Sequence, residues 1–427
     1  MALSKERHRR ICRVWTTEIQ LFGHARFALA RSLRTGSCLA METTVVPAIK
    51  PVPWLAIGAV TATVSVFAIA QGLSYPLLSF ILERQGVSPT MIGLSAAMSP
   101  LGTIVSSSLV PMLVKRLGGV RTVLCCAAFC ATLLALIGAT QNVWLWFPLR
   151  FMIGMSVIPL YVLSEVWMIS LAPAHARGRF MGFYTSTISL GFALGPATLA
   201  LVGTQGWPPF LVGIAAFLIC GLFVAAAAPR LPQFHEDEQQ GTVRRFLPVA
   251  PTLLLAVVVA AGFETAMLSL LPSYGRAFAV GEAEMATLLT VFIIGNFALQ
   301  VPFGMIADWW SARAVMLVCA VLTIVGCGLL PLVLGTPAQW PVAFFWGAFA
   351  YGIYTMAIVE LGQRFSGSML VAGNAAFALM WGIGGISGPP SAGVAMQIFG
   401  PHGLPAVMAA LCLALVLVGV VRARQRA

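Results

Sequence analysis

The residues GFALGP at positions 191–196 recur as GGISGP at positions 384–389, and each copy lies inside a long apolar segment. In both copies two glycines stand four residues apart, and a proline directly follows the second glycine. In water, glycine and proline inside a helix cost roughly 1 and 3 kcal/mol relative to alanine. Within lipid, small residues allow helix backbones to approach closely. We therefore expect each motif to pack one membrane helix tightly against another, with a bend at the proline.

One offset of 193 residues relates these two motifs and also four other pairs of positions in the chain. The matching positions are Pro111 and Gly304, Lys115 and Asp308, Gly154 and Gly347, Tyr161 and Tyr354, and the trio Gly191, Gly195 and Pro196 with Gly384, Gly388 and Pro389. Four separate places that agree on one offset indicate an internal duplication. The two glycine–proline motifs then form a symmetric pair, suited to a moving interface between two halves.

The composition requires a membrane environment. Of 427 residues, 59% are hydrophobic and 9% are charged, and the mean hydropathy is +0.93. A soluble protein needs a more highly charged surface than this. The apolar runs of about 20 residues are long enough to cross a hydrocarbon core of ~30 Å as helices. Most of the nine cysteines lie in these runs, without histidines at metal-ligand spacing, so we expect no metal site.

We expect an all-α integral membrane protein with twelve transmembrane helices in two halves of six. The expected spans lie near 54–81, 90–114, 121–140, 143–170, 180–203, 208–229, 247–272, 286–307, 313–334, 340–363, 369–395 and 402–421. The expected parts are an N-terminal half at 41–229, a polar linker at 230–246 and a C-terminal half at 247–427. Residues 1–40 hold eight Lys and Arg against two Glu, and we interpret them as a disordered basic leader or as a mis-called start preceding Met41.

The distribution of Lys and Arg among the loops predicts the orientation. From Met41 onward, fourteen of these residues fall on one side of the expected membrane, and only Arg84 and Arg276 fall on the other. The positive-inside rule then places both termini and the central loop in the cytoplasm. The formal net charge of +12 is explained by this topology, so no nucleic-acid partner is needed to account for it.

Four ionisable side chains fall within the expected spans: Arg150, Glu165, Glu264 and Glu360. Charged groups in a membrane are costly, so each is a functional candidate. Glu165 and Glu360 lie toward the cytoplasmic ends of their helices. There we expect Glu165 to pair with Arg116 or Arg179 and Glu360 to pair with Arg313, as latches that hold a cytoplasmic gate shut.

Arg150 and Glu264 lie deeper and at a similar depth, one in each half. The offset of 193 residues places Gln71 at the position equivalent to Glu264. Desolvation and a nearby cation act in opposite directions on the pKa of a buried carboxylate. Our hypothesis is that Glu264 is the proton or substrate-cation site and that Arg150 tunes it. The alternative is a static pair that only stabilises packing. The symmetric Tyr161 and Tyr354 are further candidates for the solute pathway.

Three local motifs accompany the repeat. They are Lys115, Arg116 and Gly118 after span two, with Gly304, Asp308 and Arg313 in the equivalent loop; Arg150 and Gly154 in span four; and Gly182 ahead of Gly191, Gly195 and Pro196 in span five. Taken with the duplication, this pattern from about residue 50 to 425 resembles the major facilitator superfamily. The loop motif is degraded in the first half, where Lys115 stands in the place of the family's acid. In the second half, Trp309 and Ser311 depart from the motif.

The resemblance implies a secondary transporter that works by alternating access, with its solute site between the halves near the midplane. The span-five motif is associated, by the same resemblance, with exporters driven by proton antiport. Arg179 is then a positive-inside anchor that also contacts the gate. With few buried charges, the pathway suits a small amphipathic or lipophilic solute rather than a polyanion.

We therefore expect a monomeric proton-coupled exporter of small organic solutes in a bacterial inner membrane. Its expected partners are the lipid bilayer and the solute, it needs no cofactor, and the proton gradient drives it. An importer or facilitator of sugars or metabolites with the same fold is the alternative. A non-transporting membrane sensor or scaffold is the alternative from another class. No serine–histidine pair or acidic metal cluster in the spans indicates an enzyme.

Overall fold

The computed structural model describes residues 53–140, 142–173, 177–232 and 243–424. The expected leader at 1–40, its alternative start at Met41 and most of the expected linker lie outside these ranges. The side chain of Asp308 is also outside the described part of the chain, although its backbone belongs to a helix.

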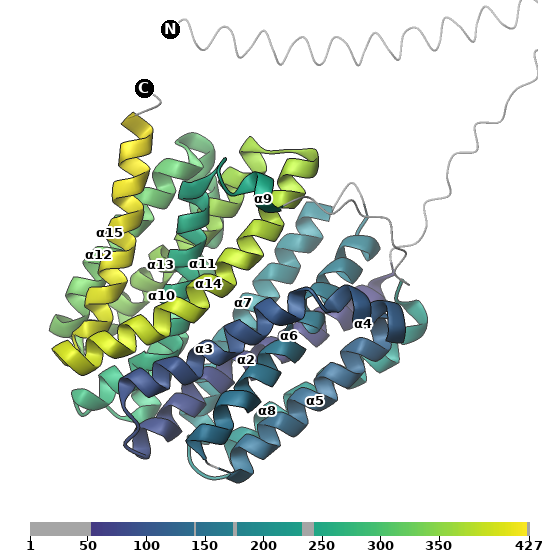
Figure 1. Ribbon diagram of the computed structural model, residues 1–427, viewed down its shortest axis with the longest axis horizontal. Helices are drawn as coiled ribbons and strands as arrows, with labels where there is room; N and C mark the ends of the chain where they lie inside the picture. The colour runs from purple at the N-terminus through teal and green to yellow at the C-terminus, as the bar shows by residue number, and fades with distance from the viewer. Residues whose placement is uncertain (1–52, 141, 174–176, 233–242, 425–427) are drawn as a thin grey trace, which may run out of the picture. The chain divides into compact units, whose positions relative to one another are not determined.

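The described residues form helices joined by short loops (Figure 1). The helices are α2 (Trp54–Arg84), α3 (Pro89–Ser107), α4 (Val110–Leu117), α5 (Gly119–Thr140), α6 (Val143–Leu171), α7 (Arg177–Val202), α8 (Pro208–Ala227), η2 (Ala228–Arg230), α9 (Val243–Phe246), α10 (Pro251–Ala277), α11 (Glu282–Trp309), α12 (Ala312–Val333), α13 (Gln339–Arg364), α14 (Gly367–Phe399) and α15 (Gly403–Arg424). Within the described ranges, eleven helices are long and apolar enough to cross a membrane, or twelve if α3 and α4 form one span. The all-helical membrane fold expected from the sequence is thus present.

The structure divides the second expected span, 90–114, into two helices, α3 and α4. Helices α3 and α4 meet at an angle of 61° across a two-residue break. Pro111 lies in the first turn of α4, where its missing N–H costs no helical hydrogen bond, so a new helix begins there readily. The corresponding helix α11 runs without a break from Glu282 to Trp309.

The offset of 193 residues seen in the sequence also relates the helix ends. Helix α5 covers 119–140 and α12 covers 312–333, which is the same shift at both ends. The packing repeats as well, because α2 contacts α7 and α8 just as α10 contacts α14 and α15. We call helices α2–α8 the N-half and helices α10–α15 the C-half.

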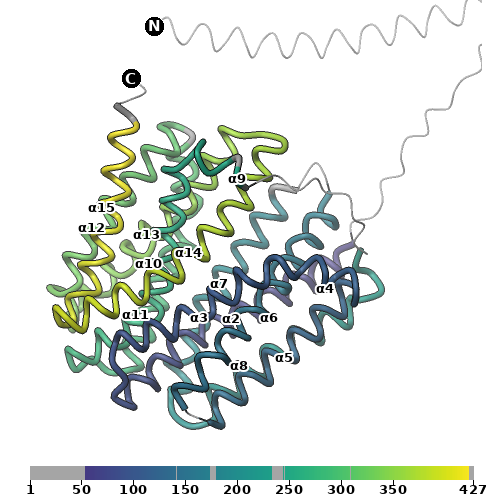
Figure 2. Tube along the Cα trace, viewed as in Figure 1, coloured from purple at the N-terminus to yellow at the C-terminus, as the bar shows by residue number. Residues whose placement is uncertain are grey.

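Several pairs of helices join the halves, and α2 and α3 both contact α10. Helix α3 packs along α14, and α7 packs along α11; the α3–α14 pair can be followed through the middle of the tube in Figure 2. We call the end of the bundle where α2 and α10 finish the distal end, and the opposite end the proximal end. The lysine and arginine count predicts that the proximal end is cytoplasmic.

Close backbone approaches hold each half together. A Cβ added at Gly154 would overlap the carbonyl oxygen of Ser99 in α3, and a Cβ at the equivalent Gly347 would overlap that of Phe292 in α11. Each half therefore depends on a glycine at the same position. The structure thus assigns the span-four glycine of the expected motif a packing role between neighbouring helices.

The two glycine–proline motifs pack as expected against neighbouring helices, but inside their own halves. Gly191 and Gly195 face the backbone of α2, and Gly384 and Gly388 face the backbone of α10. These four glycines therefore do not form the interface between the halves. Their placement differs from the moving interface suggested by the sequence, because the same helices present another face to the opposite half. There the carbonyl oxygen of Pro389 lies against Gly93 of α3.

Alanine substitutions in α7 distinguish packing glycines from the others. We expect Gly195→Ala to destabilise the folded protein by about 2 kcal/mol, because its Cβ would overlap the backbone of Gly72 and Leu73. Gly182→Ala in the same helix meets nothing within 4 Å and serves as the matched control. Thermal unfolding of the purified variants in detergent measures the difference. Equal unfolding midpoints for the two variants would contradict this packing role.

Candidate functional site

Glu264 lies on α10, partly exposed, and no hydrogen bond or ion pair reaches it from the residues that the structure describes. Four tyrosines lie within electrostatic range of its carboxylate. Tyr75 and Tyr161 come from the N-half, whereas Tyr351 and Tyr354 come from the C-half. The carboxylate is therefore placed where both halves contribute side chains.

Aromatic packing fixes the rings of this tyrosine group. The ring centroid of Tyr161 lies 4.7 Å from that of Phe67, and the ring of Tyr354 lies 4.7 Å from that of Trp381, both at steep angles. Such edge-to-face contacts favour a defined ring position. The hydroxyl oxygen of Tyr351 is buried and has no hydrogen-bond partner among the described residues. A buried hydroxyl without a partner is costly, so this atom is available to a solute or a water molecule.

Arg150 is 2% exposed and lies beside the tyrosine group. Its Nη1 donates to the hydroxyl of Ser95 at 3.1 Å, and its Cζ lies 5.8 Å from the ring centroid of Tyr75. No ion pair joins Arg150 to Glu264 in the described part of the chain. Tyr75 lies within electrostatic range of both charges, so an influence of Arg150 on Glu264 would act at a distance. The tuning role remains a prediction.

Gln71, the equivalent of Glu264, is 8% exposed on α2. Its neighbour Gly72 is the residue that Gly195 of α7 packs against. The two equivalent positions differ in charge, because the N-half has the neutral amide of Gln71 and the C-half has the carboxylate of Glu264.

Glu165 does not form the pairing expected from the sequence. Its side chain is exposed, and no ion pair with Arg116 or Arg179 is present in the described ranges. Its carboxylate instead lies within electrostatic range of Tyr184 on α7 and of Tyr354 in the opposite half. Glu165 therefore faces the space between the halves. The expectation failed because Arg116 lies in the loop-proximal α4, which bends away from the line of α3.

Glu360 forms the contact expected from the sequence at the proximal end of the C-half. Arg313 Nη2 donates to Glu360 Oε1 at 2.6 Å, and Arg364 Nη1 donates to the same oxygen at 2.8 Å. Glu360 is 5% exposed, and its carboxylate links the start of α12 to the end of α13. This cluster lies within one half, so a gating role remains a prediction.

The remaining motif residues lie around the same end. Lys115 and Arg116 are exposed in the last turn of α4, and Gly118 ends that helix with a φ of 78°, a conformation that favours glycine. Arg179 is exposed near the start of α7. A Cβ at Gly304 would meet nothing within 4 Å, so this glycine is not needed for packing.

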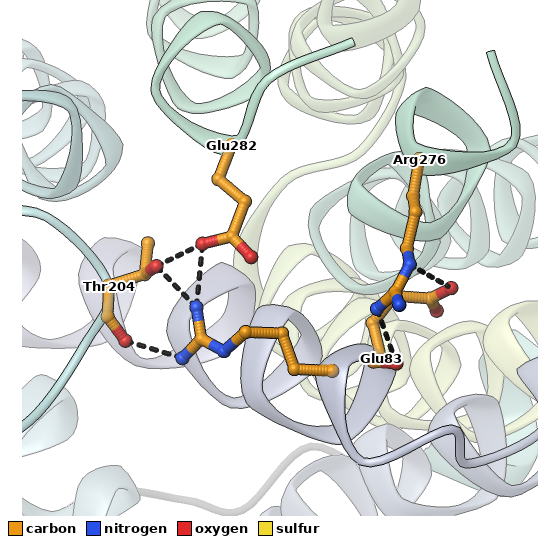
Figure 3. Close-up of polar contacts among 5 residues, drawn as sticks. Glu83, Thr204, Arg276 and Glu282 are labelled. Carbon is orange, nitrogen blue, oxygen red and sulfur yellow. Dashed lines mark hydrogen bonds and ion pairs between the residues drawn. The ribbon is translucent and has the colours of Figure 1, made fainter. Parts of the chain in front are cut away.

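A polar cluster at the distal end, absent from our sequence-based expectations, joins the halves (Figure 3). Arg84 Nη1 lies 2.6 Å from Glu282 Oε2 and 2.6 Å from the hydroxyl of Thr204, and Arg84 Nη2 lies 2.7 Å from the carbonyl oxygen of Thr204. The hydroxyl of Thr204 also donates to Glu282. Arg84 thus links the end of α2, the loop after α7 and the start of α11.

A second distal contact lies beside it, as Figure 3 shows for Glu83 and Arg276. Arg276 Nη1 donates to the carbonyl oxygen of Glu83 at 2.6 Å, and the hydroxyl of Ser273 donates to the Glu83 carboxylate. Glu83 and Arg276 are equivalent under the offset of 193 residues. Opposite charges at equivalent positions were therefore the sequence signal for this contact. We call the five residues Glu83, Arg84, Thr204, Arg276 and Glu282 the distal latch.

The fold and site together define a class: a helical membrane protein whose two halves enclose polar side chains from both. The family model described as Major Facilitator Superfamily matches residues 60–251 and 252–426. The chain belongs to this family. It is an integral, multi-pass membrane transporter, and its relatives and fold are those of transporters and not of enzymes.

Curated relatives cover most of the chain. The chain is 29% identical over 344 residues to "Uncharacterized MFS-type transporter YfkF" of Bacillus subtilis, covering 79% of this chain and 87% of that protein. It is 22% identical over 327 residues to YcaD of Escherichia coli, covering 76% and 84%. The crystal structure of the nucleoside transporter NupG has a TM-score of 0.72 at 12% identity, covering 86% of this chain and 98% of that one. A bacterial homolog of the human lysosomal transporter Spinster has a TM-score of 0.67 at 14% identity, covering 87% and 96%.

Proposed function

We propose that this protein is a proton-coupled exporter of small organic solutes that works by alternating access in a bacterial plasma membrane. The proximal end then faces the cytoplasm, because fourteen loop Lys and Arg residues lie on that side and two on the other. The bacterial relatives support the choice of membrane. The transporter acts as a monomer without a bound cofactor, and the proton gradient is its energy source.

An internal duplication supports the alternating-access mechanism. The shared offset covers the motifs, the ends of α5 and α12, and the packing glycines Gly154 and Gly347. Two equivalent halves that enclose one site between them can expose it to each side in turn by moving against each other.

The surroundings of Glu264 support the coupling of solute transport to protons. It lies between the halves, among tyrosines from both, and it lacks a basic partner within the described ranges. A carboxylate held this way gains or loses a proton according to its access to solvent, which changes as the halves move. We infer that Glu264 carries the exchanged proton.

The distal latch and the motif residues at the proximal end set the two end states. Contacts of Arg84 with Glu282 and of Arg276 with Glu83 hold the distal ends of the halves together. We infer that the distal side is closed in this structure and that the latch breaks when the solute leaves. The motif residues at the proximal end, including Glu360 and Arg313, act in the closure of the cytoplasmic side.

A flux experiment tests the proposal. The purified protein is reconstituted into vesicles, a pH gradient is imposed, and movement is followed for a cation, N-methyl-4-phenylpyridinium, a neutral base, 4-phenylpyridine, an anion, benzoate, and a nucleoside, uridine. We expect one or more of the organic solutes to move against its gradient in exchange for protons.

The alternatives predict other outcomes of the same measurement. Uridine represents an importer, because NupG is a nucleoside transporter with this fold; its uptake in the same direction as protons would replace the exporter proposal. Failure of every solute to move above the rate of protein-free vesicles would favour the sensor or scaffold and reject the exporter.

A further inference from the structure

Two acidic side chains of the bundle differ from the other acids that the structure describes in having no hydrogen-bond partner there. Four acids have a partner within hydrogen-bond distance: Glu83 has Ser273, Glu282 has Arg84, Glu284 has Gln339, and Glu360 has Arg313. Glu165 and Glu264 have none in the described ranges. One comes from the N-half and the other from the C-half.

These two carboxylates face the same space. Both lie within electrostatic range of Tyr354, which is on α13. Glu264 is also in range of Tyr161, and Glu165 follows Tyr161 by four residues, about 6 Å farther along α6. One carboxylate from each half therefore lies near the same tyrosine, with Glu165 nearer the proximal end.

The surroundings of the pair suit a positively charged ligand. Carboxylates within a membrane are costly without a counter-charge, and the nearby Arg150 is held by Ser95 instead. Tyr161 and Tyr354 present aromatic rings, which attract organic cations through their faces. The buried hydroxyl of Tyr351, without a partner in the described residues, leaves one hydrogen bond to be made.

We propose that Glu165 and Glu264, together with Tyr161 and Tyr354, form a binding site for an aromatic organic cation. This inference rests on the proposed function and names its substrate class. Glu165 holds the positive charge of the solute, while Glu264 carries the exchanged proton. The exposed position of Glu165 makes it the first carboxylate that a solute meets from the proximal side.

Direct binding tests the site without requiring transport. N-methyl-4-phenylpyridinium and 4-phenylpyridine differ by one methyl group and a positive charge, at a pH where the second is neutral. We expect the cation to bind the purified protein at least about tenfold more tightly than the neutral base, measured by calorimetry. In Glu165→Gln, the dissociation constant of the cation should rise about tenfold, with little change for the neutral base.

Glu284→Gln makes the same chemical change at the distal end of α11 and should leave both affinities unaltered. The inference is overturned if the wild-type protein binds the two probes equally, or if Glu165→Gln binds the cation as tightly as the wild type. Elution as a single species on size-exclusion chromatography shows that each variant is folded. Transport separates this result from the proposed function: proton exchange for a neutral or anionic solute would retain the exporter and reject the cation site.

Discussion

The Glu264→Gln variant is expected to lose solute movement driven by a pH gradient, to the level of protein-free vesicles. Glutamine keeps the size and the polar atoms of the side chain but cannot carry a proton. Since Glu264 has no hydrogen-bond or ion-pair partner in the described ranges, its replacement removes no structural contact. Exchange of labelled for unlabelled solute in the absence of a gradient should continue, because it requires movement of the halves but no net proton transfer.

Two further variants make the result specific. Gln71→Glu combined with Glu264→Gln transfers the carboxylate to the equivalent position of the N-half, and partial recovery of gradient-driven transport is expected. Glu284→Gln, far from the tyrosine group, should transport normally. Gradient-driven movement at the wild-type rate in Glu264→Gln would reject the coupling role.

The Arg84→Ala variant is expected to open the distal end. Arg84 makes three polar contacts, with Glu282 and Thr204, and the pair of charges is 30% and 36% exposed. Because solvent screens a partly exposed pair, we expect a loss of about 1–2 kcal/mol for the closed state. That loss shifts the balance between the closed and open states by roughly tenfold.

A cysteine reporter measures this shift. Ser269 is fully buried and lies one helical turn before Ser273, on the same face of α10. In a variant without the nine native cysteines, Ser269→Cys is labelled with a membrane-impermeant maleimide from the distal side. Arg84→Ala should increase the labelling rate about tenfold, and Glu282→Gln should also increase it. Arg276→Ala should have a smaller effect, since Arg276 is 54% exposed. Unchanged labelling in both Arg84→Ala and Glu282→Gln would contradict the latch.

The sequence predicted the membrane fold because apolar run length and loop charge depend on local composition. All twelve expected spans begin within four residues of their helices, and the expected range of span seven, 247–272, stops short of the end of α10 at Ala277. The helix extends beyond the expected range because Ser273 and Arg276 are polar, yet both donate hydrogen bonds to Glu83 of the N-half. Polarity alone could not distinguish a loop from a polar contact between the halves.

Partner choice within the site depended on features that the sequence does not display. Glu360 and Arg313 were expected to meet, and they do, because the loop between α12 and α13 is short enough to bring their helices together. Glu165 was expected to meet a loop arginine, but Arg116 lies on α4, which bends away from α3, and Glu165 lies within electrostatic range of Tyr354 instead. The tyrosine group around Glu264 requires four helices from both halves, and only their assembly reveals it.

The contact between α3 and α14, which we call the α3–α14 seam, is closer at its distal end than at its proximal end. Toward the distal end, a Cβ at Gly93 or Gly393 would overlap the carbonyl oxygens of Pro389 or Pro89, so two backbones touch there. Toward the proximal end, a Cβ at Gly385 or Gly382 would instead overlap side-chain atoms of Pro100 or Ile104. The Ile104 side chain can yield by changing rotamer, whereas backbones must move apart as whole helices. We therefore expect the seam to behave as a lever with its fulcrum near Gly93, in which opening toward the distal side is the slower half of the transport cycle.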